Sequence, residues 1–172
     1  MALALAAPAH PGYAHMVKSR LSRTVAASES AAVYDADFFA WTRQTAALLR
    51  ARRFDEVDVE HAAGEIEDMG KGDLRELNGR LQVLLVHLLE WQLQPKKRTS
   101  SWQTTLLAQR FEIDALLHDS PSLRPRLSHD LPANYACAVK RAMLETGLRA
   151  DKFPSRCPFI LEQILDEDFL PG

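Results

Sequence analysis

The sequence predicts an all-α fold, a helical bundle of about five to six helices with short connections. Three observations lead to this class. From residue 35 onward, apolar residues recur at intervals of three and four, which is the period of an amphipathic helix. The seven glycines and nine prolines fall mostly between these periodic segments. No stretch alternates apolar and polar residues in the way that a half-buried strand does.

The first helix is predicted over residues 35–52. Acidic residues in its first turn and arginines near its end complement the helix dipole. Its predicted buried stripe consists of Phe38, Trp41, Thr45, Leu48 and Leu49.

A second helix is predicted to begin near Asp58, with that residue as its N-cap. One face of this helix carries Val59, Ala62, Ala63, Ile66 and Met69. The glycines within residues 70–73 and a capping box that begins at Asp73 favour a break, although the apolar stripe also continues as it would in one long, kinked helix. We therefore predict two helices, over 58–69 and 73–93.

The central and most buried helix is predicted over residues 73–93, because its apolar residues alternate in steps of three and four as in a bundle seam. These seam residues are Leu74, Leu77, Leu81, Leu84, Leu88 and Trp91. Gln94 and Pro95 are predicted to end the helix.

Four further helices are predicted after residue 98, one of them a short helix that follows a turn at residues 118–125. Ser100 or Ser101 is expected to cap a helix of about 17 residues; its inward residues are Trp102, Leu106, Ile113, Leu116 and Leu117. Pro132 suits the first turn of the next helix, which is expected to end at Gly147. The residues of this helix that are predicted to face the core are Tyr135, Val139, Ala142 and Met143. A short helix is expected around residues 159–165.

Composition and charge limit the function classes. The 172 residues are 47% hydrophobic and 26% charged, the balance of an ordinary globular protein. The net charge of −2 gives no strong signal for nucleic acid, and no run approaches the ~18 apolar residues of a membrane span. Two cysteines are too few for a disulfide framework, so a cytoplasmic location is expected.

The predicted domain organisation is one extension and one domain. Residues 1–33 carry three basic residues and one acidic residue, whereas the remainder carries 18 basic and 22 acidic residues. We expect residues 1–33 to be a disordered or loosely ordered extension, with a targeting segment or a start at Met16 as alternatives. Residues 34–171 are expected to form a single all-α domain.

Several short stretches resemble, in order, the bacterial and cyanobacterial family called domain of unknown function 29. They are residues 34–41, 65–70, 84–92, 101–102, 109–110, 119–123, 145–148 and 157–171. The resemblance covers about residues 34–171 and implies a small all-helical protein with no assigned activity. Gly64 and Glu90 depart from the family pattern, which usually has Glu at the first position and a basic residue at the second.

His87 is one candidate for chemistry, because it is the polar residue most enclosed by apolar neighbours. Imidazole titrates near neutral pH and binds metals. A structural hydrogen bond to a neighbouring helix is the favoured interpretation. A di-metal bundle normally draws Glu-x-x-His from two helices, and the sequence contains no such motif, so neither a metal nor a cofactor is predicted.

Glu65 and Glu67 form, with Asp68, an acidic patch that suits a general base or Mg²⁺ ligands. The structural alternatives are a solvated helix flank or pairing with an arginine, for which Arg110 is the candidate, and structural pairing is favoured. Arg110 has Asp114, one turn further along its own helix, as the alternative partner.

Three weaker signals have simple explanations. The pairs at 118–119 and 129–130 match the His-Asp dyad of helical phosphohydrolases, but chance pairing in a chain with six histidines explains them adequately. Cys157 beside Arg156 is either a thiol of lowered pKa or, more commonly, a small buried residue. The basic loop 96–98 is expected to be solvated.

The favoured function is a non-enzymatic module that binds a protein partner or a second copy of itself. Trp91 and Trp102 flank the basic loop, and an aromatic patch at that end suits an interface. The alternative is a metal-dependent hydrolase or nuclease that uses His87 or the Glu65/Glu67 patch.

Overall fold

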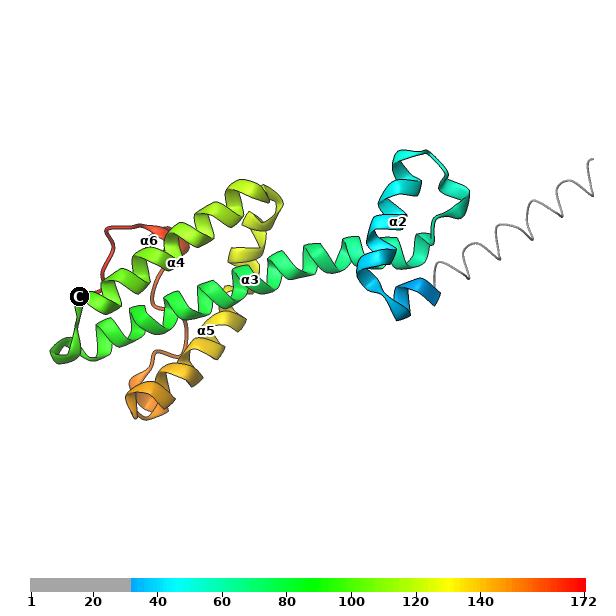
Figure 1. Ribbon diagram of the computed structural model, residues 1–172. Helices are drawn as coiled ribbons and strands as arrows, with labels where there is room; N and C mark the ends of the chain where they lie inside the picture. The colour runs from blue at the N-terminus through cyan, green and yellow to red at the C-terminus, as the bar shows by residue number, and fades with distance from the viewer. Residues whose placement is uncertain (1–31) are drawn as a thin grey trace, which may run out of the picture. The chain divides into compact units, whose positions relative to one another are not determined.

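The computed structural model describes residues 32–172, and every regular element in that part of the chain is a helix, as Figure 1 shows. The predicted all-α class is confirmed. The described residues form two compact units, which are treated separately: unit 1 covers residues 32–69 and unit 2 covers Gly70–Gly172. The predicted extension lies almost wholly outside the described residues, and a single domain over 34–171 stays a prediction.

Unit 1 begins with a helical stretch at residues 32–36 and continues into α2, Phe38–Arg50. Asp37 separates the two, because its backbone leaves the helical region and its Oδ1 accepts a hydrogen bond from the Ala40 amide at 2.9 Å. The uninterrupted helix predicted over 35–52 is therefore wrong at this point. A short 3₁₀ helix, η1 (Phe54–Glu56), leads to α3.

The buried residues of unit 1 are few. Trp41, Thr45 and Leu48 of α2 are buried as predicted, and Val57 joins them. Phe38 and Leu49, which the same prediction placed in the stripe, are half exposed. This small core spans little more than one face of α2.

α3 runs without a break from Val59 to Leu93, so the predicted break at residues 70–73 is wrong. A glycine inside a helix costs about 1 kcal/mol relative to alanine, and that cost does not outweigh an uninterrupted hydrogen-bond ladder. None of the α3 glycines has positive φ. Asp73 does not cap a new helix; instead its Oδ2 accepts a hydrogen bond from Ser120 Oγ at 3.3 Å. The predicted N-cap of α3 is confirmed, since Asp58 Oδ1 accepts from the His61 amide.

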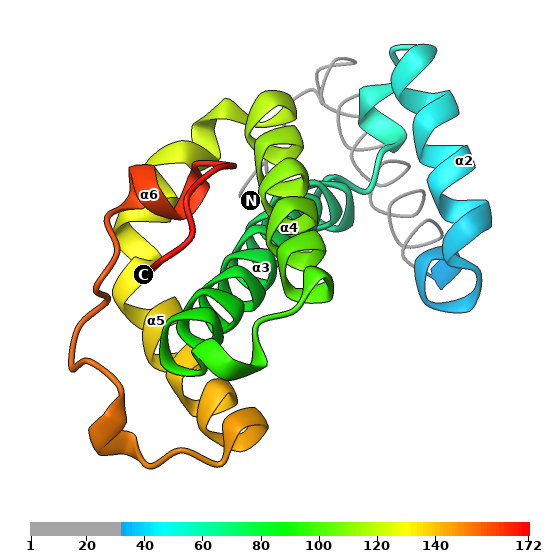
Figure 2. The same cartoon turned by 90° about the vertical axis from the view of Figure 1, so that its left-hand side faces the viewer.

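In unit 2, α4 (Ser100–Asp119) runs beside the C-terminal part of α3, whereas α5 (Arg124–Thr146) crosses α3, as Figures 1 and 2 show. The short α6 (Leu161–Leu165) is joined to α4 by the hydrogen bond from Arg110 to the Ile164 carbonyl. Three 3₁₀ turns connect these helices: η2 (Pro95–Lys97), η3 (Pro121–Leu123) and η4 (Ala150–Lys152).

Two predicted helix starts in unit 2 are wrong. Thr99, rather than Ser100 or Ser101, caps α4, because its Oγ1 accepts from the Trp102 amide. Pro132 lies inside α5 and not in its first turn. A proline inside a helix removes one backbone hydrogen bond and crowds the carbonyl four residues earlier, yet α5 continues, with the buried Leu127 and Tyr135 on either side of Pro132.

The leucine-rich part of α3 is the centre of the unit 2 core, as predicted. The fully buried members of this core are Leu77, Leu81, Leu84, Leu85, Val86, Leu88, Leu89, Leu106, Ile113, Leu127, Ala138, Ala142 and Ile164. At about 1.5–3 kcal/mol for each large side chain buried, this cluster is the main stabilising contribution of the unit.

Asn134 is the main polar link between α3 and α5. Its Oδ1 accepts from Gln82 Nε2 at 2.9 Å, and its Nδ2 donates to Asn78 Oδ1 at 2.7 Å. Asn134 is buried, so these two bonds satisfy amide groups that would otherwise be costly in the interior.

Two glycines of unit 2 differ in what an added methyl group would meet. Gly79 has helical backbone and is exposed, and a Cβ there has nothing within 4 Å. Gly147 ends α5 with φ 71°, a conformation that L residues rarely adopt.

We expect Gly79→Ala to raise the free energy of unfolding by about 1 kcal/mol and Gly147→Ala to lower it by about 1 kcal/mol. Urea denaturation followed by circular dichroism measures both; equal effects of the two changes would contradict this assignment.

Candidate interaction surface

His87 pairs with a buried carboxylate on its own helix. Its Nδ1 lies 2.9 Å from Oε2 of Glu90, one turn further along α3, and Glu90 is only 5% exposed. The predicted hydrogen bond from His87 to a neighbouring helix is therefore wrong, because the partner lies on the same helix. A buried carboxylate needs a polar partner, and His87 supplies it, which is a structural role.

Glu65 pairs with a tyrosine and not with the predicted arginine. The Tyr34 hydroxyl donates to Glu65 Oε1 at 2.5 Å, which is a short, charge-assisted bond. Glu67 and Asp68, the other members of the predicted acidic patch, are exposed and each makes contacts of its own. His87 belongs to unit 2 and Glu65 to unit 1, and each bonds within its own unit.

Tyr34, Trp41 and His61 form an aromatic cluster that ties the first described residues to α3. The Tyr34 ring lies 4.1 Å from that of His61 and 5.0 Å from that of Trp41. His61 Nδ1 is in turn 2.6 Å from Oδ2 of the buried Asp58. The hydrogen bond to Glu65, helped by burial, raises the pKa of Tyr34. A raised pKa means that Tyr34 holds its proton more firmly and so stays a hydrogen-bond donor to Glu65, which joins the first described residues to α3.

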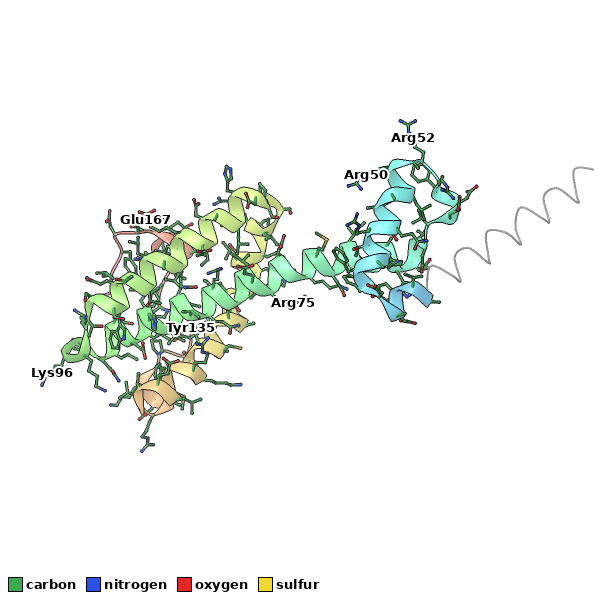
Figure 3. The ribbon with its side chains drawn as sticks, in the orientation of Figure 1. Arg50, Arg52, Arg75, Lys96, Tyr135 and Glu167 are labelled. Carbon is green, nitrogen blue, oxygen red and sulfur yellow. The ribbon has the colours of Figure 1, made fainter. Side chains whose placement is uncertain are left out.

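Arg110 holds the C-terminal segment of the chain. It is 3% exposed, and its guanidinium donates to the carbonyls of Ile164 at 3.0 Å, Glu167 at 3.0 Å and Phe169 at 2.8 Å. Neither Asp114 nor the acidic patch is its hydrogen-bond partner, so both predicted pairings are wrong. Burial lowers the pKa of Arg110, and the acidic residues 166–168 oppose that shift. Figure 3 shows Glu167 beside α4.

The predicted aromatic interface is wrong for Trp91. This residue is buried, and the Arg98 guanidinium covers its ring at 5.1 Å from the centroid. Arg98 also donates to the carbonyls of Trp91 and Pro171. Trp102 is half buried. Lys96 projects outward at the turn between α3 and α4, as Figure 3 shows.

Cys157 lines a cavity of about 430 Å³ with Tyr135, Arg156 and three further residues. Burial raises the pKa of the Cys157 thiol, so the lowered value considered beside Arg156 is wrong. Burial also raises the pKa of Tyr135 to about 12, and its hydroxyl donates to the Pro154 carbonyl at 2.7 Å. The cavity therefore contains no activated nucleophile among these side chains.

In one of the two His-Asp pairs, His129 Nδ1 lies 2.6 Å from Asp130 Oδ1. That hydrogen bond, with Arg126 nearby, holds the pKa of Asp130 below its usual range. His129 is highly exposed, so the pair is a surface contact. Within residues 32–172, no group of three or more His, Cys, Asp or Glu side chains is placed to hold a metal ion. None of the described helices is long and apolar enough to cross a membrane.

The most unusual feature of unit 1 is its exposed apolar side chains. Seven large hydrophobic residues are 44–73% exposed among the 38 described residues of this unit, compared with five among the 103 residues of unit 2. We call the seven the unit 1 apolar surface; they are Phe38, Phe39, Leu49, Phe54, Val59, Ile66 and Met69. Most of the seven belong to the apolar stripes predicted for the first two helices. Periodicity alone would place those stripes in the core.

The charge of unit 1 is also distinctive. Residues 32–69 contain nine acidic and four basic residues, a net charge of −5, whereas residues 70–172 contain 13 acidic and 14 basic residues. The basic residues of unit 1 lie on α2 and the turn after it, where Figure 3 shows Arg50 and Arg52 projecting outward. The part of α3 in unit 1 is therefore both acidic and apolar on its exposed faces.

The Arg110 contacts predict a large effect on stability. Arg110→Lys keeps a positive charge but loses the planar fork that reaches three carbonyls, so we expect the free energy of unfolding to fall by about 2–4 kcal/mol. Arg126→Lys, at an exposed ion pair on α5, is the matched control and should change it by less than about 0.5 kcal/mol. Similar effects of the two changes in urea denaturation would refute the role given to Arg110.

The two thiols are predicted to differ in reactivity. Cys137 is exposed, whereas Cys157 is half buried and has a raised pKa, so less of it is thiolate at a given pH. In the Cys137→Ser variant, alkylation of Cys157 by iodoacetamide should be slower than alkylation of Cys137 in the Cys157→Ser variant. It should also need a higher pH, as mass spectrometry across pH 6–10 would show. Faster alkylation of Cys157 would contradict its burial.

One of three comparisons with known proteins finds a match. The family model described as Domain of unknown function DUF29 matches residues 33–170, nearly all of the described chain. Neither the search of curated proteins nor the search of solved structures finds a match. Because the family model covers most of the sequence, the chain belongs to the DUF29 family.

Proposed function

We propose that the chain is a non-enzymatic, cytoplasmic interaction module that binds protein through the unit 1 apolar surface. The observation that carries the proposal is the density of exposed large hydrophobic side chains in this unit. Contiguous exposed apolar surface marks interaction sites on soluble proteins, and seven such side chains among the 38 described residues of unit 1 favour one here.

The polar candidates support the same proposal. The side chains of His87, Glu65 and Arg110 are all engaged in hydrogen bonds within their own units. The alternative, a metal-dependent hydrolase or nuclease, needs acids, bases or metal ligands that converge on one position. The described residues bring no such set together around His87 or the Glu65/Glu67 patch. The two cysteines are unpaired, which fits the reducing cytoplasm.

Photo-cross-linking in living cells tests the module directly, because it captures whichever protein touches the labelled position. Benzoylphenylalanine is introduced at Ile66 or Phe39 of the full chain, and at Leu144 as a control, since Leu144 is 86% exposed but lies on α5 of unit 2. We expect discrete adducts of higher mass at positions 66 and 39 and none at 144. The absence of discrete adducts at 66 and 39, or equal adducts at all three positions, would overturn the proposal.

A further inference from the structure

The first turns of α3 carry an exposed seam of the kind that packs against another helix. Val59, Ala63 and Ile66 follow one another at steps of four and three, so they lie on one face. Val59 and Ile66 are 61% and 68% exposed, and Ala63 is also exposed. We call these three residues the α3 seam. Their spacing is that of the a and d positions of a coiled coil, with a small residue between two branched ones.

One border of the α3 seam is acidic. Glu60 and Glu67 are seven residues apart, and each follows a large residue of the seam, so they occupy the same border position in successive heptads. Both are exposed. On the opposite border the equivalent positions are Ala62 and Met69. In coiled coils, charges at such border positions determine which partner helix is accepted.

These charges argue against a second copy of this chain as the occupant. Two copies would each bring a unit of net charge −5 to the contact. An antiparallel pair of seams would also place the acidic borders against one another, and like charges across an interface are unfavourable.

Resting on the interaction role proposed above, we propose that the α3 seam is the docking site for a basic amphipathic helix of another protein. The partner helix contributes apolar residues at the seam and lysines or arginines opposite Glu60 and Glu67. This is helix-in-groove recognition, in which apolar anchors give affinity and border charges give specificity.

Two synthetic helical peptides of about three heptads test the charge requirement. Both carry leucine at their a and d positions; one has lysine and the other glutamate at the border positions. Fluorescence anisotropy with the full chain should show at least about tenfold tighter binding of the lysine peptide. Binding should weaken with added salt. Equal binding of both peptides, or no binding of the lysine peptide at 100 μM, would overturn the inference.

Ile66→Asp separates docking on the seam from general attraction between opposite charges. The added carboxylate makes unit 1 more acidic, so non-specific attraction for the lysine peptide would increase, whereas docking on the seam should be lost. Glu60→Lys should reduce the preference for the lysine peptide several-fold, and Leu144→Asp should leave binding unchanged. Tighter binding by Ile66→Asp would show general electrostatics and refute the seam. Circular dichroism of each variant checks that the helices are retained.

The cross-linking experiment distinguishes this inference from the broader proposal. Adducts at position 66 with the mass of two chains would identify a second copy as the occupant, which overturns the basic helix but leaves an interaction module. Adducts with another protein, combined with no peptide preference, would also leave the module and reject the charge rule. No adducts and no peptide binding would reject both.

Discussion

The apolar contact between the leucine-rich part of α3 and the helices α4 and α5 is the interaction on which unit 2 depends. Six leucines of α3 are completely buried in this contact, namely Leu77, Leu81, Leu84, Leu85, Leu88 and Leu89, and the polar groups of the unit are arranged around them. Asn134 can bond Gln82 and Asn78 because this contact brings α5 against α3. Arg110 likewise reaches the C-terminal carbonyls from the buried side of α4. The directional bonds thus follow from apolar packing and then fix its geometry.

Helical periodicity predicts the class, the central helix and most of its buried residues. It fails where local and long-range effects oppose one another. The glycines of residues 70–73 lower helix propensity, but the cost is small beside a continuous hydrogen-bond ladder, and α3 continues. Pro132 similarly interrupts one bond of α5 without ending it. A single sequence shows whether a residue favours or disfavours a helix locally. Whether the helix actually ends there also depends on packing against residues that are distant in the sequence.

The candidate site is harder to predict for a different reason. Side chains that bond to backbone carbonyls, as Arg110 does, leave no trace in the sequence, because every residue has a carbonyl. The Tyr34–Glu65 bond joins residues 31 positions apart, and no pattern relates them. Periodicity also identifies an apolar face without telling what covers it. Ile66 and Met69 fit a core stripe as well as Leu77 does, yet they are exposed.

The C-terminal segment has a consequence for how this protein can evolve. Arg110 and Arg98 hold the segment by donating hydrogen bonds to its backbone carbonyls. Every residue has such a carbonyl, whatever its side chain. Substitutions at the exposed positions 167 and 168 leave these carbonyl acceptors in place, but the acidic charge of residues 166–168 also opposes the lowering of the Arg110 pKa by burial. Ile164 and Phe169 are more constrained, because their side chains also contribute to the core. The backbone anchorage of the segment therefore does not depend on side-chain shape at its exposed positions, whereas their negative charge still supports the buried Arg110.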